Sequence, residues 1–128
     1  MNNIPFKQIR QALSDNKDVA FAYIFGSSAG KAEIKDKSDL DIAVYFYENP
    51  DFDRMYSLIR EMENLVGEDA IDLVVLNGCE DFILRNEILK GDMVFCRDRD
   101  LHAGFFSWTL RMYEDQMLRD KGFRVSQQ

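Results

Sequence analysis

The sequence has little of what a disulfide-linked, zinc-binding or membrane-spanning protein requires. Its 128 residues include only two cysteines, two prolines and one histidine. No apolar run approaches the roughly twenty residues of a membrane span, and the start, MNNIPFKQIR, lacks the apolar segment of a signal peptide. Cys79 and Cys96 are not spaced as metal ligands, so we expect two free thiols and no zinc site. These absences favour a cytoplasmic protein with no membrane contact.

Basic residues are also few relative to acidic ones. The chain has 16 Lys and Arg against 23 Asp and Glu, which gives a formal net charge of −7 at pH 7. Nucleic-acid binding requires a basic stripe that neutralises phosphates, and no Lys/Arg cluster here exceeds what a solvated helix face carries. We therefore expect no direct contact with nucleic acid, and we expect any polyanion that binds to arrive with its own metal ions.

Apolar spacing predicts alternating helices and strands within one domain, residues 1–128. Steps of three and four residues predict helices, and short apolar runs that end at Gly or Asn-Gly predict strands. The predicted helices span residues 4–16, with Pro5 in the first turn, 51–66, 80–91 and 101–119; the predicted strands span 18–26, 39–47, 70–78 and 92–97. This order predicts an α/β (α+β) domain with a small mixed β-sheet flanked by helices.

The second predicted strand begins with two carboxylates on one face. Residues two apart in a strand point to the same side, so Asp39 and Asp41 share a face, while Leu40 and the residues alternating with it form the expected core face. Two like charges near a core need a compensating cation, and oxygen-only ligands favour Mg²⁺. Asp72 in the third strand is the expected third ligand, with Asp69 as the weaker substitute. An Asp-x-Asp pair can bridge two metal ions, as in nucleotidyl transfer, although a solvated strand start is the alternative interpretation.

A Gly-Ser pair ends the first predicted strand. Gly26 lets the backbone approach a ligand closely, and the following turn can direct N–H groups and the Ser27 hydroxyl toward a phosphate. A simple strand-ending turn is the alternative. The order of a phosphate-binding turn, paired carboxylates and a third carboxylate favours a single compact site.

The segment FGSSAGKAEIKDKSDLDIAVYF resembles the signature of the DNA polymerase β-type nucleotidyltransferase superfamily, in which Gly-Ser is followed beyond a short loop by Asp-x-Asp. The chain from about Phe21 to Asp100 is similar to the minimal nucleotidyltransferases of the MNT or MntA type. The resemblance implies the polymerase β-like palm fold. It also implies that Gly26 and Ser27 hold the triphosphate of ATP. Lys31 follows Ala29-Gly30 where the family often has Arg, and we expect it to supply a positive charge to the phosphates.

The same resemblance implies roles for the carboxylates and a partner. Asp39, Asp41 and Asp72 would be the catalytic ligands of two Mg²⁺ ions. Family members are antitoxins that transfer AMP from ATP to a tyrosine of a HEPN ribonuclease toxin (HepT), so the implied activity is that of an antitoxin-type protein adenylyltransferase in a hetero-oligomer. Two alternatives remain: a small-molecule nucleotidyltransferase of the aminoglycoside-modifying kind, and a non-catalytic antitoxin that acts by docking alone.

The last predicted helix, 101–119, carries two apolar stripes. One consists of Leu101, Phe105, Trp108 and Met112, and the other of Phe106, Leu110, Tyr113 and Met117. One stripe suffices for the helix's own core, so the second predicts a partner contact through this helix, unless the N-terminal helix covers both. His102, at the helix start, is expected to be a surface or capping residue without a catalytic role.

Overall fold

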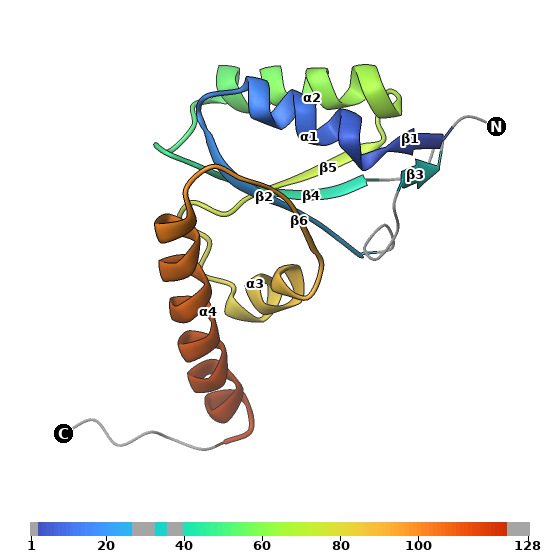
Figure 1. The fold of residues 1–128 in the computed structure, drawn as a ribbon. Helices are drawn as coiled ribbons and strands as arrows, with labels where there is room; N and C mark the ends of the chain where they lie inside the picture. Colours follow the sequence, from blue (N-terminus) through green and yellow to red (C-terminus); the bar gives the residue numbers. More distant parts are fainter. Residues whose placement is uncertain (1–2, 27–32, 36–39, 123–128) are drawn as a thin grey trace.

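A computed structural model describes residues 3–26, 33–35 and 40–122 of the chain. Figure 1 shows a sheet between two pairs of helices. One face is covered by α1 (Phe6–Asp15) and α2 (Phe52–Val66), and the other by α3 (Phe82–Leu89) and α4 (Arg99–Asp120). The predicted architecture, a small mixed sheet flanked by helices, is confirmed.

The central sheet has four strands in the order β5-β4-β2-β6. Their bounds are β2 (Val19–Phe25), β4 (Leu40–Phe46), β5 (Ile71–Val75) and β6 (Asp92–Cys96). β2 is antiparallel to both β4 and β6, whereas β4 and β5 are parallel and are connected through α2. A parallel pair needs such a crossover, and it brings the starts of β4 and β5 to the same end of the sheet.

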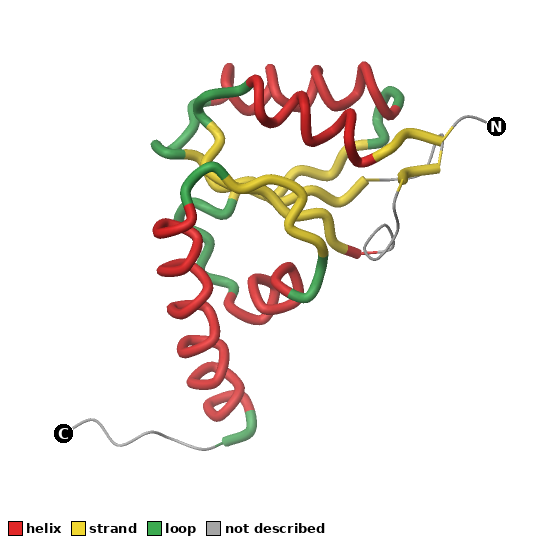
Figure 2. The backbone as a smooth tube through the Cα atoms, in the orientation of Figure 1, coloured by secondary structure: helices red, strands yellow, loops and turns green. Residues whose placement is uncertain are grey.

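Two short strands lie outside the predicted set. β1 (Asn3–Pro5) pairs antiparallel with β3 (Glu33–Lys35), and Figure 2 shows this ribbon beside the main sheet. The first helix therefore begins at Phe6, and Pro5 ends a strand instead of opening the helix, which corrects the prediction of a helix from residue 4. Three-residue strands carry too few side chains to produce a detectable alternation, and Pro is tolerated in a strand that has a free edge.

Both faces of the sheet are buried. Leu40, Ile42 and Val44 face α1 and α2, as expected for the core side. On the opposite side, which also carries Asp41, Ala43 is buried in a second apolar cluster that includes Phe105 of α4. The expectation that only the Leu40 face forms core was thus incomplete, because α3 and α4 form a second core on the Asp41 face.

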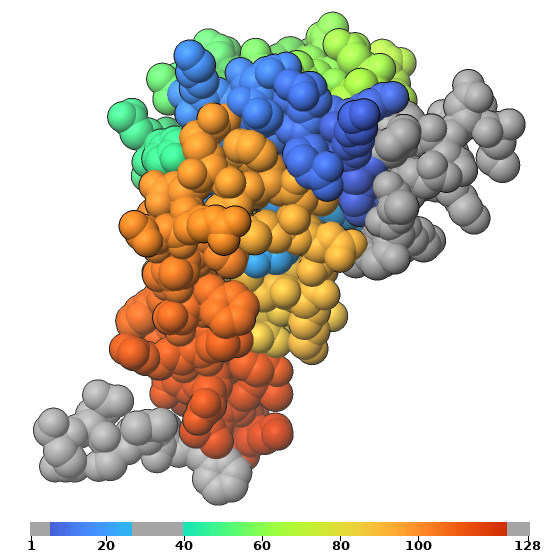
Figure 3. Space-filling model, in the orientation of Figure 1, coloured from blue at the N-terminus to red at the C-terminus, as the bar shows by residue number. Residues whose placement is uncertain are grey.

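The helix α4 packs on α3 and on the sheet near its start, and its later turns continue beyond the sheet (Figures 1 and 3). The N-terminal helix α1 lies on the other face of the sheet, so the proposal that it covers both apolar stripes of α4 is wrong. Leu110 and Trp108 remain 42% and 46% exposed. Among the helices in the described ranges, none is long and apolar enough to cross a lipid bilayer.

Candidate active site

Asp41 and Asp72 lie next to each other at one end of the sheet. The parallel register of β4 and β5 pairs Asp41 directly with Asp72. Neighbouring strands are about 4.8 Å apart, and residues paired in register project from the same face. Both carboxylates therefore project from the face that carries α3 and α4. Two predicted ligands, 31 positions apart in the sequence (72 − 41), thus come from adjacent strands.

Gly26 forms the third side of this site. Phe25 at the end of β2 pairs with Asp41, and Gly26 follows with φ of 71°, in the left-handed region. A Cβ placed on Gly26 would clash with Oδ2 of Asp41 and would lie 3.2 Å from its Cγ. The absence of a side chain therefore lets the Asp41 carboxylate lie against the backbone of Gly26. The end of β2 and the Asp41 carboxylate are thus in direct contact.

The two carboxylates differ in exposure. Asp41 is partly buried on the inner strand β4, whereas Asp72 is exposed on β5, which is an edge strand of the sheet. The exposure of Asp72 leaves its carboxylate accessible to solvent, and the register of the two strands places this second carboxylate beside that of Asp41.

Three of the predicted site residues, Ser27, Lys31 and Asp39, lie outside the described residues. In the part of the chain that the structure describes, no group of three or more His, Cys, Asp or Glu side chains is arranged to hold a metal ion. Asp41 and Asp72 supply a pair of oxygen donors, which suits a hard cation such as Mg²⁺, and a protein site for Mg²⁺ uses only one or a few carboxylates. The donor chemistry of Asp41 and Asp72 therefore fits the predicted ion.

His102 occupies a position that the sequence did not predict. Its Nε2 lies 2.7 Å from the Tyr23 hydroxyl, and the two rings stack with centroids 5.7 Å apart. The N-cap of α4 is Asp98, so the predicted capping role of His102 is wrong, and its partly buried side chain contacts β2. Burial lowers the pKa of His102 below 6.5 and raises the pKa of Tyr23 above 10.0. The pair joins residues of β2 and α4 that are 79 positions apart in the sequence, so no local spacing pattern could predict their contact.

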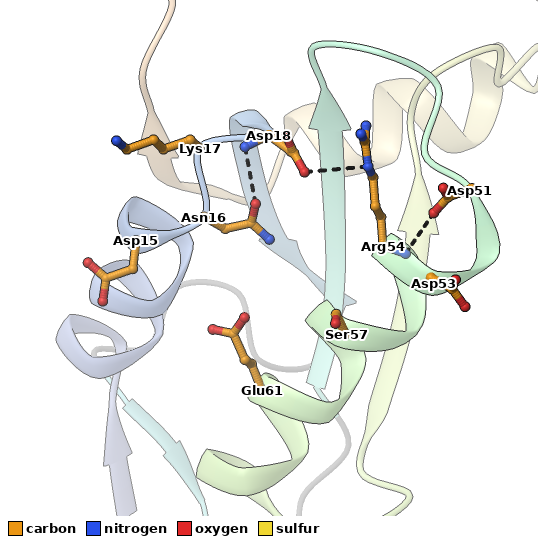
Figure 4. A pocket seen from close by; sticks show the side chains of 9 residues that line it. All are labelled: Asp15, Asn16, Lys17, Asp18, Asp51, Asp53, Arg54, Ser57 and Glu61. Atoms are coloured by element: carbon orange, nitrogen blue, oxygen red, sulfur yellow. Dashed lines mark hydrogen bonds and ion pairs between the residues drawn. The ribbon is translucent and has the colours of Figure 1, made fainter.

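An acidic groove of about 670 Å³ lies between the end of α1 and the start of α2 (Figure 4). Its lining residues are Asp15, Asn16, Lys17, Asp18, Asp51, Asp53, Arg54, Ser57 and Glu61. Asp18 forms an ion pair with Arg54 at 3.7 Å, and Asp51 accepts a hydrogen bond from the Arg54 backbone as the N-cap of α2. These roles are structural, and the groove lies near Val19, at the end of β2 opposite to the one that pairs with Asp41.

Residues 7–100 match the family described as polymerase beta, nucleotidyltransferase. The chain belongs to this nucleotidyltransferase family. Two relatives come from Methanocaldococcus jannaschii and are provisionally named protein adenylyltransferases, MJ1215 and MJ0128. MJ1215 is 38% identical over 68 residues, which cover 53% of this chain and 77% of that protein. MJ0128 is 31% identical over 86 residues, which cover 67% of this chain and 85% of that protein.

Solved structures share the nucleotidyltransferase fold. A chain of an MntA–HepT toxin–antitoxin variant has a TM-score of 0.72 at 21% identity, with 93% of this chain and 94% of that chain covered. A structure of a toxin–antitoxin with AMP-PNP has a TM-score of 0.70 at 22% identity, with 91% of this chain and 92% of that chain covered. A Shewanella oneidensis complex of tri-AMPylated HEPN toxin with MNT antitoxin has a TM-score of 0.68 at 20% identity, with 91% of this chain and 89% of that chain covered. At these identities the likeness concerns the fold.

Proposed function

We propose that residues 1–128 form one minimal nucleotidyltransferase domain that transfers AMP from ATP to a tyrosine hydroxyl of a cognate HEPN toxin and so neutralises it. The observation that carries the proposal is the direct register of Asp41 with Asp72, with Gly26 against the Asp41 carboxylate. Relatives named protein adenylyltransferases support the reaction type. The neighbours with AMP-PNP and with a tri-AMPylated HEPN toxin support the nucleotide and the partner.

In the proposed reaction, the acceptor hydroxyl attacks the α-phosphorus of ATP in line. A bond forms between the acceptor oxygen and phosphorus, the bond to the β-phosphate oxygen breaks, pyrophosphate leaves, and the hydroxyl proton passes to solvent. Gly26 and Ser27 hold the triphosphate through backbone N–H groups and the hydroxyl. Lys31 contributes a point charge, without the planar fork of an Arg.

Asp39, Asp41 and Asp72 would hold the two Mg²⁺ ions of this proposal. When bound, Mg²⁺ neutralises phosphate charge and lowers the pKa of a coordinated hydroxyl, so the protein need not provide a separate base. Asp72 is exposed on the edge strand, where an acceptor protein has access, and we assign it to the acceptor side of the site. Asp41 lies against the phosphate-binding turn and is assigned to the nucleotide side.

The distal part of α4 is the proposed docking surface for the toxin. A groove of about 520 Å³ lies there, and its lining includes Leu110, Tyr113, Met117 and Leu118. Leu110 and Leu118 are 42% and 37% exposed, so apolar area remains uncovered in the isolated chain. Apolar side chains in a groove with a polar rim are typical of a protein–protein contact. The acceptor protein would then be positioned by α4 instead of by a second domain.

Intact-mass spectrometry tests the proposed function. The chain is incubated with ATP, Mg²⁺ and the HEPN protein encoded by an adjacent gene, and an AMP-sized mass increment on that partner is the expected result. Asp72→Asn is expected to abolish the increment. Asp53→Asn is the matched control, because Asp53 is an exposed carboxylate in the first turn of α2 and lines the acidic groove at the opposite end of β2.

Other outcomes separate the alternatives. Transfer of AMP to an aminoglycoside but not to the partner would favour the small-molecule enzyme. A stable complex without any mass increment, in which the Asp72→Asn variant neutralises the toxin as well as the parent, would favour docking alone. An increment that survives Asp41→Asn combined with Asp72→Asn would contradict the assigned site.

A further inference from the structure

The side chain of Arg85 on α3 is a buried cation that has no ion-pair partner among the residues that the structure describes. It is only 7% exposed, and it forms no salt bridge with any residue in the described ranges 3–26, 33–35 and 40–122. Its Nε donates to Thr109 Oγ1 at 2.9 Å, and its Nη1 donates to the Cys79 carbonyl at 3.0 Å. The guanidinium also lies over the rings of Phe82 and Phe105, at 4.7 and 4.1 Å from their centroids. Neutral groups therefore hold this charge in place.

The remaining nitrogen of Arg85, Nη2, is available to a ligand. It makes no hydrogen bond within the described part of the chain, where every buried side-chain nitrogen or oxygen has a partner. Nη2 must therefore reach accessible surface. Burial lowers the pKa of Arg85, because desolvation disfavours the cation, and an anion that bound to Nη2 would offset this cost.

Arg85 lines a cavity of about 350 Å³ whose wall includes three aromatic rings. Tyr45, Phe105 and Trp108 contribute rings to it, and Trp108 is 46% exposed. Cavities of this size bind small ligands when apolar walls surround a few polar groups. Tyr45 follows Asp41 by four residues on β4, which is a separation of about 13 Å along the strand. The cavity is therefore separate from the candidate active site.

We propose that this cavity binds a small aromatic monocarboxylate, with its carboxylate on Arg85 Nη2 and its ring against Tyr45 and Trp108. The exposed carboxylate of Asp100 also lines the cavity. It repels negative charge, so a singly charged carboxylate fits better than a doubly charged phosphate. The flat walls favour an aromatic body, because stacked or edge-on rings interact favourably.

Trp108 supplies the assay, because it is the only tryptophan of the chain. The full chain is titrated with benzoate, and with benzamide as the uncharged analogue of the same shape, while Trp108 fluorescence is recorded. A saturable change with benzoate and none with benzamide at equal concentration is expected. No saturable change with benzoate, or an equal change with both compounds, overturns the proposal.

Two variants locate the site. Arg85→Met is expected to weaken benzoate binding by at least about tenfold, the loss expected for a charge-assisted hydrogen bond. Arg60→Met, which removes an exposed Arg of α2, is the control and should bind benzoate like the parent. Gly104→Leu places a side chain on a cavity-lining position where a Cβ meets no atom within 4 Å, and it should also weaken binding. Unchanged affinity in Gly104→Leu, or in an Arg85→Met variant that retains its circular dichroism spectrum, overturns the assignment.

Discussion

Single residues set the geometry of the candidate active site. Gly26 has a positive φ, and it leaves no room for a Cβ beside the Asp41 carboxylate. Backbone strain and side-chain collision are separable effects here, because Gly78 has nearly the same φ, 70°, with no atom within 4 Å of an added Cβ. Substitution of Gly78 therefore reports the cost of the positive φ alone, and comparison with Gly26 isolates the effect of the contact with Asp41.

The variant Gly26→Ala is expected to displace the Asp41 carboxylate and to lower the rate of AMP transfer by about 10- to 100-fold, as misplacement of a catalytic group by about 1 Å does. Both Gly26→Ala and Gly78→Ala should lose about 1–2 kcal/mol of stability through the strained φ. Transfer is followed by intact mass and stability by thermal unfolding. Equal transfer rates in the two variants would show that the contact with Asp41 has no part in catalysis.

The pair of His102 and Tyr23 predicts a pH dependence of stability. The folded protein holds the pKa of His102 below its ordinary 6.5 through burial, so the unfolded chain binds a proton more readily. Stability is therefore expected to fall as the pH decreases through 6.5 toward the lower folded pKa. His102→Gln removes this titration, and its unfolding midpoint should depend less on pH over the same interval. Parallel pH profiles of parent and variant would refute the prediction.

At the scale of elements, strong periodicity identified the four helices and the four strands of the central sheet, with bounds shifted by a few residues. The short strands β1 and β3 were missed because three residues do not define an alternation. The elements of the candidate active site were predictable because Asp41 and Asp72 lie in strands that are consecutive in the central sheet and joined by one helix. The contacts of Arg85 with Thr109 and of His102 with Tyr23 were not predictable, because these partners lie 24 and 79 positions away in the sequence.

The junction between α3 and β6 depends on Gly91. A Cβ at this position would clash with the carbonyl oxygen of Ile24 and would lie 3.0 Å from the Cα of Phe25. Because backbone atoms of β2 cannot move aside cheaply, Gly91→Ala is expected to destabilise the protein by about 1–3 kcal/mol. Gly104→Ala, at an open helical position, should instead stabilise it by up to about 1 kcal/mol. Denaturant unfolding measures both, and a neutral Gly91→Ala would contradict this close packing.

At the scale of the whole molecule, the proposed functions lie in different elements: AMP transfer at the end of the sheet and partner binding on α4. The sheet end carries Asp41 and Asp72. The distal turns of α4 extend beyond the sheet (Figure 3), and Leu110 and Leu118 on this helix are exposed. The exposed apolar groove on α4 is the proposed docking surface. Binding through α4 and transfer at the sheet should then respond to different substitutions.

Leu110→Glu places a charge in the α4 groove and is expected to weaken partner binding by about thirtyfold, the cost of a hot-spot residue. Its unfolding midpoint should stay near that of the parent, because Leu110 is already 42% exposed. Ser107→Glu adds the same charge at an exposed position of α4 outside this groove and should leave binding unchanged. Co-elution with the HEPN partner and a direct binding titration measure the effect. Because Leu110 lies on α4 and not on the strands that carry the carboxylates, AMP transfer by Leu110→Glu should recover at saturating partner concentration, whereas transfer by Asp72→Asn should not. Loss of transfer that no partner concentration restores would place the effect of Leu110 on catalysis or folding and would contradict a docking role for α4.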